Sequence, residues 1–248
     1  PIQYYKNNVY GSLILFEEME AANIKSIVFS SSATVYGQQK NPLLNEEVSL
    51  NPKNVYGKTK VVIENILTDI HKASKDWKII ILRYFNPIGA HSSGLIGESP
   101  SDIPNNLLPF ISQVAVGKRE KLLIFGSDYP TSDGTGKRDY IHVCDLARAH
   151  LLSLNYLFKK ERLFSIFNLG TGKSKSVLEV IKIFEEVSGV KIPYKITNRR
   201  LGDVAECLAD PSKAKRILGW ESEFDFYRMC QDTWRWQQKN PEGIKDRR

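Results

Sequence analysis

The sequence predicts an α/β fold built on a doubly wound parallel sheet, and three observations lead to this prediction. Residues 24 to 30 and 78 to 85 are short runs rich in β-branched and aromatic side chains, which is typical of strands buried on both faces. Between them, apolar residues recur at helical spacing from Val61 to Ile70. Strand, helix and strand in this order indicate a βαβ unit with a right-handed crossover.

The other elements follow from local signals along the chain. Residues 8 to 22 predict a helix that already lies inside a βα series, so we expect a further N-terminal piece of the fold. Asp145 is placed to cap a helix that runs to residue 158, and residues 164 to 169 predict another buried strand. Ser176 and Glu179 form a capping box for a helix that ends at Gly189.

A change of amino-acid composition after Asn86 predicts a domain boundary. Residues 87 to 104 are rich in Pro, Gly and Ser, as expected where a chain leaves a sheet. We therefore assign residues 1 to 86 to the C-terminal part of an N-terminally truncated sheet domain. Residues 87 to 248 form a smaller α/β region, from which residues 140 to 170 return to the sheet.

Composition excludes several classes of function. The net charge of +7 is spread along the chain among acidic residues, which does not favour nucleic acid as a partner. No apolar stretch approaches the roughly 18 to 20 residues that cross a bilayer, so we expect no membrane partner and a cytoplasmic location. The three cysteines form no CxxC pair and the four histidines share no metal-ligand spacing, so we expect no disulfide framework and no metal.

The pair Tyr56 and Lys60 carries the most chemical information. The two side chains stand four residues apart at the start of a predicted helix and so share one face. A phenol that acts as a base near pH 7 needs its pKa lowered by about three units, or roughly 4 kcal/mol. One ammonium group at about 5 Å supplies roughly 3 kcal/mol at an effective dielectric constant of 20, and a second positive charge could supply the rest.

Taken alone, this spacing is more often ordinary packing than catalysis. The context changes that balance, because the pair follows a buried strand that ends in the serines 30 to 32, and doubly wound sheets bind ligands at the carboxyl ends of their strands. Ser32 is then positioned to share a proton with Tyr56. Without Tyr56 and Lys60, the serine run would be equally well explained as a polar strand exit.

Three segments together resemble a known family. SSSATVYG (residues 30–37), YGKTK (56–60) and LRYFNPIGAH (82–91) are similar to the extended short-chain dehydrogenases/reductases, and most closely to the UDP-glucose 4-epimerase family, over essentially the whole chain. The resemblance implies a Rossmann-like fold, NAD as cofactor, and interconversion of UDP-galactose and UDP-glucose by transient oxidation at C4, as in galactose metabolism. Tyr56 would remove the proton of the 4-hydroxyl, Ser32 would assist, and Lys60 would lower the pKa of the phenol.

The same resemblance assigns binding residues. Those that would line the NAD site are Asn7, Ser30, Tyr56, Lys60, Tyr84 and Phe85. Those that would contact the UDP-sugar are Ser32, Ala33, Thr34, Asn86, Asn105, Asn106, Leu107, Leu123, Ile124, Phe125, Arg138, Arg200, Asp203 and Cys207. Structural explanations compete with several of them: a helix N-cap for Asn7, core packing for Tyr84, a turn with a helix cap for Asn105 and Asn106, and a solvated charge for Arg200.

The resemblance also bears on specificity and assembly. Cys207 matches a position beside the sugar pocket, where a small residue would admit UDP-GalNAc and UDP-GlcNAc, although Cys207 could equally be just a small buried residue. Members of the family form homodimers through the helices that flank the catalytic Tyr. The Gly-rich loop that would hold the NAD pyrophosphate is not in this sequence.

Two alternatives to an epimerase fit the same residues. One is a related NAD-dependent dehydratase, decarboxylase or reductase, although the dehydratases usually carry Thr-Asp-Glu where this chain has Ser32-Ala33-Thr34. The other is a non-catalytic fragment that only binds the UDP-sugar. Tight UDP-sugar binding without NAD would distinguish this second possibility.

Overall fold

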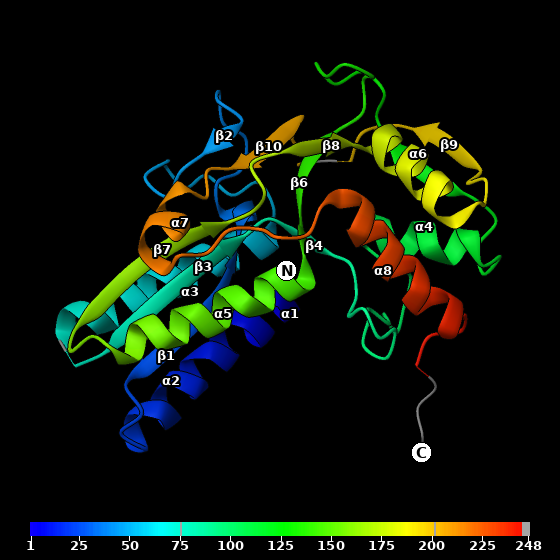
Figure 1. The fold of residues 1–248 in the computed structure, drawn as a ribbon. Helices are drawn as coiled ribbons and strands as arrows, with labels where there is room; N and C mark the ends of the chain where they lie inside the picture. Colours follow the sequence, from blue (N-terminus) through cyan, green and yellow to red (C-terminus); the bar gives the residue numbers. More distant parts are fainter. Residues whose placement is uncertain (75, 201, 245–248) are drawn as a thin grey trace. The chain divides into compact units, whose positions relative to one another are not determined.

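The chain folds into two compact units that alternate along the sequence (Figure 1). The computed structural model describes residues 1–74, 76–200 and 202–244. Unit 1 consists of Pro1–Phe85, Ala147–Gly172 and Leu208–Glu221, and unit 2 of Asn86–Leu146, Lys173–Cys207 and the chain from Ser222 onward. Among the described residues, no helix has both the length and the apolar character needed to cross a membrane.

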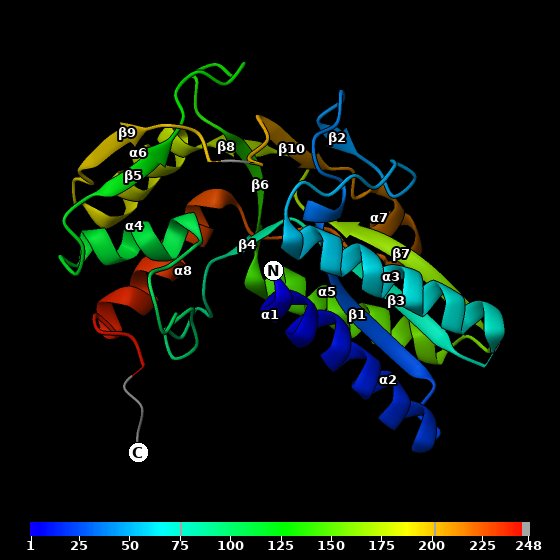
Figure 2. The same cartoon turned by 180° about the vertical axis from the view of Figure 1, so that it is seen from behind.

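Unit 1 is built on a parallel three-stranded sheet. Its strands are β1 (Ser26–Ser32), β3 (Lys78–Tyr84) and β7 (Leu163–Leu169), in the order β1-β3-β7. Figures 1 and 2 show α2 (Gly11–Ala21) and α3 (Val55–Ala73) on one face of this sheet and α5 (Val143–Phe158) on the other. The prediction of a doubly wound, Rossmann-like α/β fold is confirmed.

The core of unit 1 follows from the apolar run in β3. Four consecutive residues of this strand, 79 to 82, have no exposed surface, so both faces of the strand are covered. Ile79 and Ile81 pack against Ile63 and Leu67 of α3, and Trp77 closes the same cluster. A continuous apolar run rather than an alternating one is what a strand between two helical layers requires.

The N-terminal helical segment begins earlier than predicted. It comprises α1 (Ile2–Tyr4), a π-helical stretch η1 (Tyr5–Tyr10) and α2, so a start at residue 8 was wrong. Smaller elements complete unit 1: the 3₁₀ turn η2 (Ala33–Val35), β2 (Leu43–Leu44), which pairs with the end of β10 (Glu206–Ala209), and α7 (Ser212–Leu218).

The described part of unit 2 contains several short strands and the helices α4 (Leu107–Ala115), α6 (Val177–Ser188) and α8 (Phe226–Lys239). In it, β6 (Lys137–His142) pairs with β4 (Asn86–Ile88), with β8 (Ser174–Ser176) and with residues Glu206 and Cys207 of β10. A separate pair is formed by β5 (Leu122–Phe125) and β9 (Tyr194–Thr197). The helices α4, α6 and α8 contribute Ile111, Phe184 and Met229 to one apolar core.

Two predicted helix caps have different outcomes. Ser176 Oγ accepts the backbone N–H of Glu179 at 3.0 Å while Glu179 accepts that of Ser176 at 2.8 Å, and Gly189 ends α6 with φ 70°, so this capping box is confirmed. Asp145, in contrast, lies in the first turn of α5, which begins at Val143. Its carboxylate accepts the backbone N–H groups of Glu223 (3.0 Å) and Phe224 (3.1 Å) and thereby fixes the segment that leads into α8.

Candidate active site

Helix α3 begins in a way that brings Tyr56 close to the end of β1. Asn54 is the N-cap, and its Oδ1 accepts the backbone N–H of Gly57 at 2.7 Å. A Cβ atom at Gly57 would lie 2.7 Å from the carbonyl oxygen of Thr34 and 3.0 Å from Cβ of Pro52. Only glycine lets the first turn of α3 approach the η2 turn this closely, which explains the residue that follows Tyr56.

The hydroxyl of Ser32 is oriented toward Tyr56 by its neighbours. Ser32 Oγ accepts two hydrogen bonds from Thr34, one from the backbone N–H (3.2 Å) and one from the side-chain hydroxyl (3.0 Å). Its own proton is therefore available to the Tyr56 hydroxyl, to which Ser32 is hydrogen-bonded. A donor aimed at the phenolic oxygen favours the phenolate, so this arrangement suits proton transfer at Tyr56.

Lys60 is held by the same strand end. Its Nζ donates a hydrogen bond to the backbone carbonyl of Ser30 at 2.8 Å. The ammonium group lies 5.6 Å from the ring centre of Tyr56 and 4.9 Å from that of Phe29. The structure therefore brings together the three residues that the sequence singled out, and each is tied to a different group within residues 30 to 34.

Burial sets the ionisation of this cluster in a direction that the sequence did not indicate. Burial, reinforced by the neighbouring Tyr84 and opposed by the Ser32 hydrogen bond, raises the pKa of Tyr56 to about 12. Burial also lowers the pKa of Lys60, against an opposing effect of Glu64. Ionisation of Tyr56 at pH 7 thus needs about 7 kcal/mol, more than the 4 kcal/mol expected from an exposed phenol.

The residues predicted for the NAD site lie around the end of β1 and β3. The Tyr84 hydroxyl is hydrogen-bonded to Ser30, whose Oγ lies 2.9 Å from Nε2 of His150. Phe85 is buried, and its backbone N–H donates to the Leu169 carbonyl at 2.9 Å. These contacts place Tyr84 among polar partners rather than in a purely apolar core.

The amides of the π-helical stretch η1 also reach this region. Asn7 lies inside that stretch and is exposed, so it is not a helix N-cap. Its Nδ2 donates to Asn8 Oδ1 at 3.0 Å, and Asn8 Nδ2 donates in turn to Thr59 Oγ1 on α3 at 3.0 Å. Amides, hydroxyls and the Lys60 ammonium are the donor set that ribose hydroxyls and a carboxamide require, so these residues fit the nicotinamide half of NAD.

Unit 2 gathers five of the residues predicted to bind the UDP-sugar. The guanidinium carbon of Arg200 lies 4.6 Å from the ring centre of Phe125, and Arg200 Nε lies 3.3 Å from Asp203 Oδ2. Asp203 Oδ1 is 4.0 Å from an Arg138 nitrogen, and Arg138 pairs with Cys207 in the sheet register. Burial raises the pKa of the Cys207 thiol to about 12, so this side chain is neutral.

Of the other residues predicted to bind the UDP-sugar, Ser32, Ala33 and Thr34 lie in unit 1, and the rest lie elsewhere in unit 2. Asn86 is exposed on β4, Leu123 is half-exposed on β5, and Ile124 beside it is buried in the core. Asn105 is exposed, and Leu107 is the first residue of α4. Asn106 occupies the N-cap position of α4 without capping it, and its Nδ2 donates instead to Glu98 Oε1 at 3.0 Å.

The structure reveals two features that sequence reasoning missed. Glu64, one turn beyond Lys60, is only 3% exposed and is salt-bridged to Arg83 at 2.6 Å. Its four-residue spacing from Lys60 was visible in the sequence, but its burial was not. Tyr129 is also buried; its hydroxyl has no hydrogen-bond partner among the described residues, and the Arg199 guanidinium stacks 4.0 Å from its ring centre.

Comparison with known proteins gives a consistent result. The family model described as GDP-mannose 4,6 dehydratase matches residues 1–233. A UDP-glucose 4-epimerase of Bacillus subtilis is 54% identical over 245 residues, which cover 99% of this chain and 72% of that protein. The chain belongs to the UDP-glucose 4-epimerase family. Ser32-Ala33-Thr34, where the dehydratases usually have Thr-Asp-Glu, agrees with membership of the epimerases rather than of the dehydratases.

Solved structures of epimerases share the fold. The UDP-glucose 4-epimerase from Bifidobacterium longum, in complex with NAD+ and UDP, aligns with a TM-score of 0.94 at 48% identity, covering 98% of this chain and 72% of that one. The enzyme from Stenotrophomonas maltophila, with bound NAD and formylated UDP-arabinopyranose, gives 0.93 at 49% identity, with coverage of 96% and 71%. The present chain thus spans about seven tenths of these epimerase chains.

Proposed function

We propose that this chain carries the acid–base machinery and the nucleotide-sugar-binding residues of an NAD-dependent epimerase that interconverts UDP-galactose and UDP-glucose. The observation that supports this most directly is the arrangement of Ser32, Tyr56 and Lys60 at the end of β1, in a chain 54% identical to a UDP-glucose 4-epimerase. Two hydroxyls in a hydrogen bond beside an ammonium group can remove and return one proton.

The proton at C4 of the sugar is handled by Tyr56. Its phenolate oxygen accepts the proton of the 4-hydroxyl, while the Ser32 hydroxyl donates to that oxygen and the Lys60 ammonium offsets its negative charge. In the return direction Tyr56 gives the proton back. The Lys60 nitrogen lies 5.6 Å from the ring centre of Tyr56, so its positive charge favours the phenolate over the phenol.

NAD, when bound, supplies the redox chemistry by accepting a hydride from C4 and returning it. The residues of this chain that would hold its nicotinamide half are Asn7, Ser30, Lys60, Tyr84 and Phe85. Tyr84 keeps its hydroxyl bound to Ser30, and the Lys60 ammonium has two N–H donors beyond its bond to the Ser30 carbonyl. These donors would bind ribose hydroxyls and orient the ring.

The UDP-sugar would be held by the unit 2 residues that the resemblance names. The guanidinium groups of Arg138 and Arg200 suit the diphosphate, and Asp203 can accept from a ribose hydroxyl. Asp203 currently contacts both arginines, so binding of a diphosphate would compete with an existing ion pair. We also propose that Cys207, being small, admits a 2-N-acetyl group, so that UDP-GalNAc and UDP-GlcNAc are substrates too.

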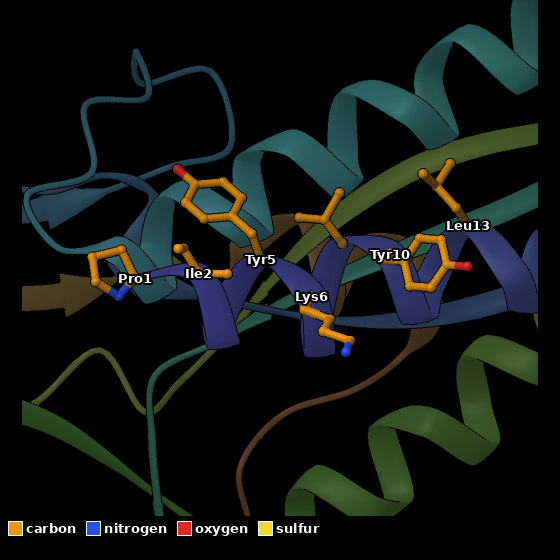
Figure 3. A pocket seen from close by; sticks show the side chains of 7 residues that line it. Pro1, Ile2, Tyr5, Lys6, Tyr10 and Leu13 are labelled. Atoms are coloured by element: carbon orange, nitrogen blue, oxygen red, sulfur yellow. The ribbon is translucent and has the colours of Figure 1, made fainter.

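We further propose that the enzyme is a cytoplasmic homodimer. The N-terminal helices expose apolar side chains, among them Ile2 (83% exposed), Tyr10 (58%) and Leu15 (52%). An open hollow of about 680 Å³ lies along this segment, and Figure 3 shows Tyr5 and Leu13 projecting on the same side of the helix. Apolar surface of this kind on adjacent helical turns is typical of a protein–protein contact.

The test of the proposed function is an assay of the 248-residue chain for conversion of UDP-galactose to UDP-glucose, with and without added NAD. We expect conversion with NAD, and a loss of at least about a hundredfold in Tyr56→Phe, which cannot exchange a proton. Tyr227→Phe, at a half-exposed position on α8, is the matched control and should retain activity. Sedimentation of the same preparation gives the oligomeric state.

Absence of conversion in a folded chain that binds UDP-sugar would contradict catalysis by this chain. Conversion that survives Tyr56→Phe would contradict the assignment of the proton transfer to Tyr56.

A further inference from the structure

Helix α3 presents three polar side chains, one turn apart, to three consecutive serines at the end of β1. Tyr56 is hydrogen-bonded to the hydroxyl of the third serine, and Lys60 to the carbonyl of the first. Glu64 engages the second: Ser31 Oγ donates to Glu64 Oε1 at 2.5 Å. The first two contacts belong to the proton-transfer site, whereas the third has no part in the proposed reaction.

Glu64 is held with unusual completeness for a buried carboxylate. Both it and Arg83 are 3% exposed, and Arg83 donates to it through Nη2 (2.6 Å) and Nε (3.1 and 3.2 Å). Arg83 Nη1 donates to the Tyr36 hydroxyl at 3.0 Å, which donates to Asn168 Oδ1 at 2.7 Å. The carboxylate thus joins α3 to β1 and β3 through bonds that are all directional.

Stability alone does not explain why the chain has this network. Apolar side chains of similar volume at two such positions are often as stabilising as a buried ion pair, because both ions lose their hydration. The network instead fixes geometry. Ser31 lies between the carbonyl that binds Lys60 and the hydroxyl that binds Tyr56, so its position determines both.

We propose that Glu64 is a positioning residue for the epimerase reaction proposed above: its carboxylate fixes Ser31, and with it the adjacent Ser30 carbonyl and Ser32 hydroxyl, in the positions that Lys60 and Tyr56 use. The carboxylate also places a negative charge one helical turn from the Lys60 ammonium. The inference rests on the proposed function for its chemical meaning, but the state of Lys60 can be measured without turnover.

The electrostatic effect of Glu64 on Lys60 can be tested separately, because the charges near Lys60 are identifiable. Burial lowers the pKa of Lys60 and Glu64 raises it, so Glu64 favours the ammonium form. The other titratable or charged groups around this cluster in the described chain include Tyr4 on α1, Tyr36 after η2, Tyr56 on α3, Arg83 and Tyr84 on β3, and His150 on α5. Removal of the Glu64 charge alone should therefore shift Lys60 toward its neutral form.

The experiment compares Glu64→Gln, which keeps the size and an acceptor, with Glu64→Asp, which keeps the charge on a shorter side chain. Reductive methylation of the full 248-residue chain is followed by mass spectrometry of the Lys60 peptide between about pH 6 and 10, where the amine changes state. We expect the titration midpoint of the Lys60 amine to fall in Glu64→Gln, so that labelling below this pH is about threefold faster than in wild type. In Glu64→Asp, the titration midpoint should stay near that of wild type.

Measurement of turnover tests whether Glu64 also fixes the geometry of the site. Both variants should lower kcat for UDP-galactose by about tenfold or more with little change in KM. Glu64→Gln weakens the Arg83 contacts that hold the acceptor of Ser31, and Glu64→Asp moves that acceptor. Asp69→Asn, which removes an exposed carboxylate of the same helix paired with Lys72 at 3.4 Å, is the matched control and should change neither readout.

A Lys60 midpoint that is unchanged in Glu64→Gln, together with an unchanged kcat, would overturn the proposal and leave Glu64 with a purely structural role. Should Glu64→Gln fail to fold, a wild-type kcat in Glu64→Asp would overturn it equally. If no protein turns over UDP-galactose while Glu64→Gln still shifts the Lys60 midpoint, the proposed function fails and the role of Glu64 toward Lys60 stands.

Discussion

The buried ion pair of unit 1 allows a quantitative prediction of stability. Arg83 and Glu64 lie 2.6 Å apart with side chains 4% exposed. At this distance and an effective dielectric constant of 20, their attraction is about 6 kcal/mol, most of which is offset by the lost hydration of both ions. Arg83→Met removes the attraction but leaves the carboxylate buried, so we expect a loss of about 3 to 5 kcal/mol.

Hydrogen–deuterium exchange of the β1 and β3 amides measures this loss in the unit that contains the pair. The double variant Glu64→Leu/Arg83→Met has no unpaired charge, so it should lose less stability than Arg83→Met alone. Lys72→Met on the same helix breaks an exposed pair and should cost less than about 0.5 kcal/mol.

A loss below about 1 kcal/mol in Arg83→Met would refute this reasoning, because it would mean that water or another cation reaches the Glu64 carboxylate. Equal losses in the single and double variants would show that the two charges are not coupled.

Two further predictions concern unit 2. Cys207→Tyr should abolish turnover of UDP-GalNAc and retain that of UDP-galactose in a coupled assay with both substrates, whereas equal activity on both would contradict a size limit at this position. Burial favours the neutral form of Glu179, but the hydrogen bonds that its carboxylate accepts from Ser176 and the charge of Lys175 together lower its pKa. The stability that this carboxylate contributes is therefore present above about pH 4.3 and is lost as the pH falls further. In Glu179→Gln, the protection of the α6 amides against hydrogen exchange should therefore depend less on pH in the acid range. An unchanged pH dependence would argue against this capping box as its source.

Regular elements of unit 1 could be predicted from sequence because their signals are local. The apolar run of β3 and the helical spacing of α3 each extend over enough residues to fix the type of element. Fewer elements of unit 2 could be predicted, since β4, β5, β8 and β9 have three or four residues each. Strands this short contain too few repeats for a pattern, and their pairing is set by contacts that are distant in sequence.

The candidate site shows the same division between local and distant information. The spacing of Tyr56 and Lys60 predicted a shared helix face, and the structure shows them beside the same strand end. Burial was not visible in the spacing, so the rise in the Tyr56 pKa was not predicted. Asn106 sits at a cap position as its sequence context suggests, yet its side chain bonds Glu98, a residue that no local rule selects.

One face of α3 therefore carries both the residues proposed for proton transfer and the buried ion pair that holds the same strand end. Tyr56, proposed to transfer the proton, and Lys60, proposed to offset the negative charge of the phenolate, contact the end of β1. Glu64 binds Ser31 of the same strand and is ion-paired with Arg83. Gly57 sets how closely the helix can approach, because any side chain there would meet the Thr34 carbonyl. A substitution that relaxes one of these contacts moves the serines that the others use. The stability of the α3–β1 junction and the geometry of proton transfer thus cannot be altered independently at these positions.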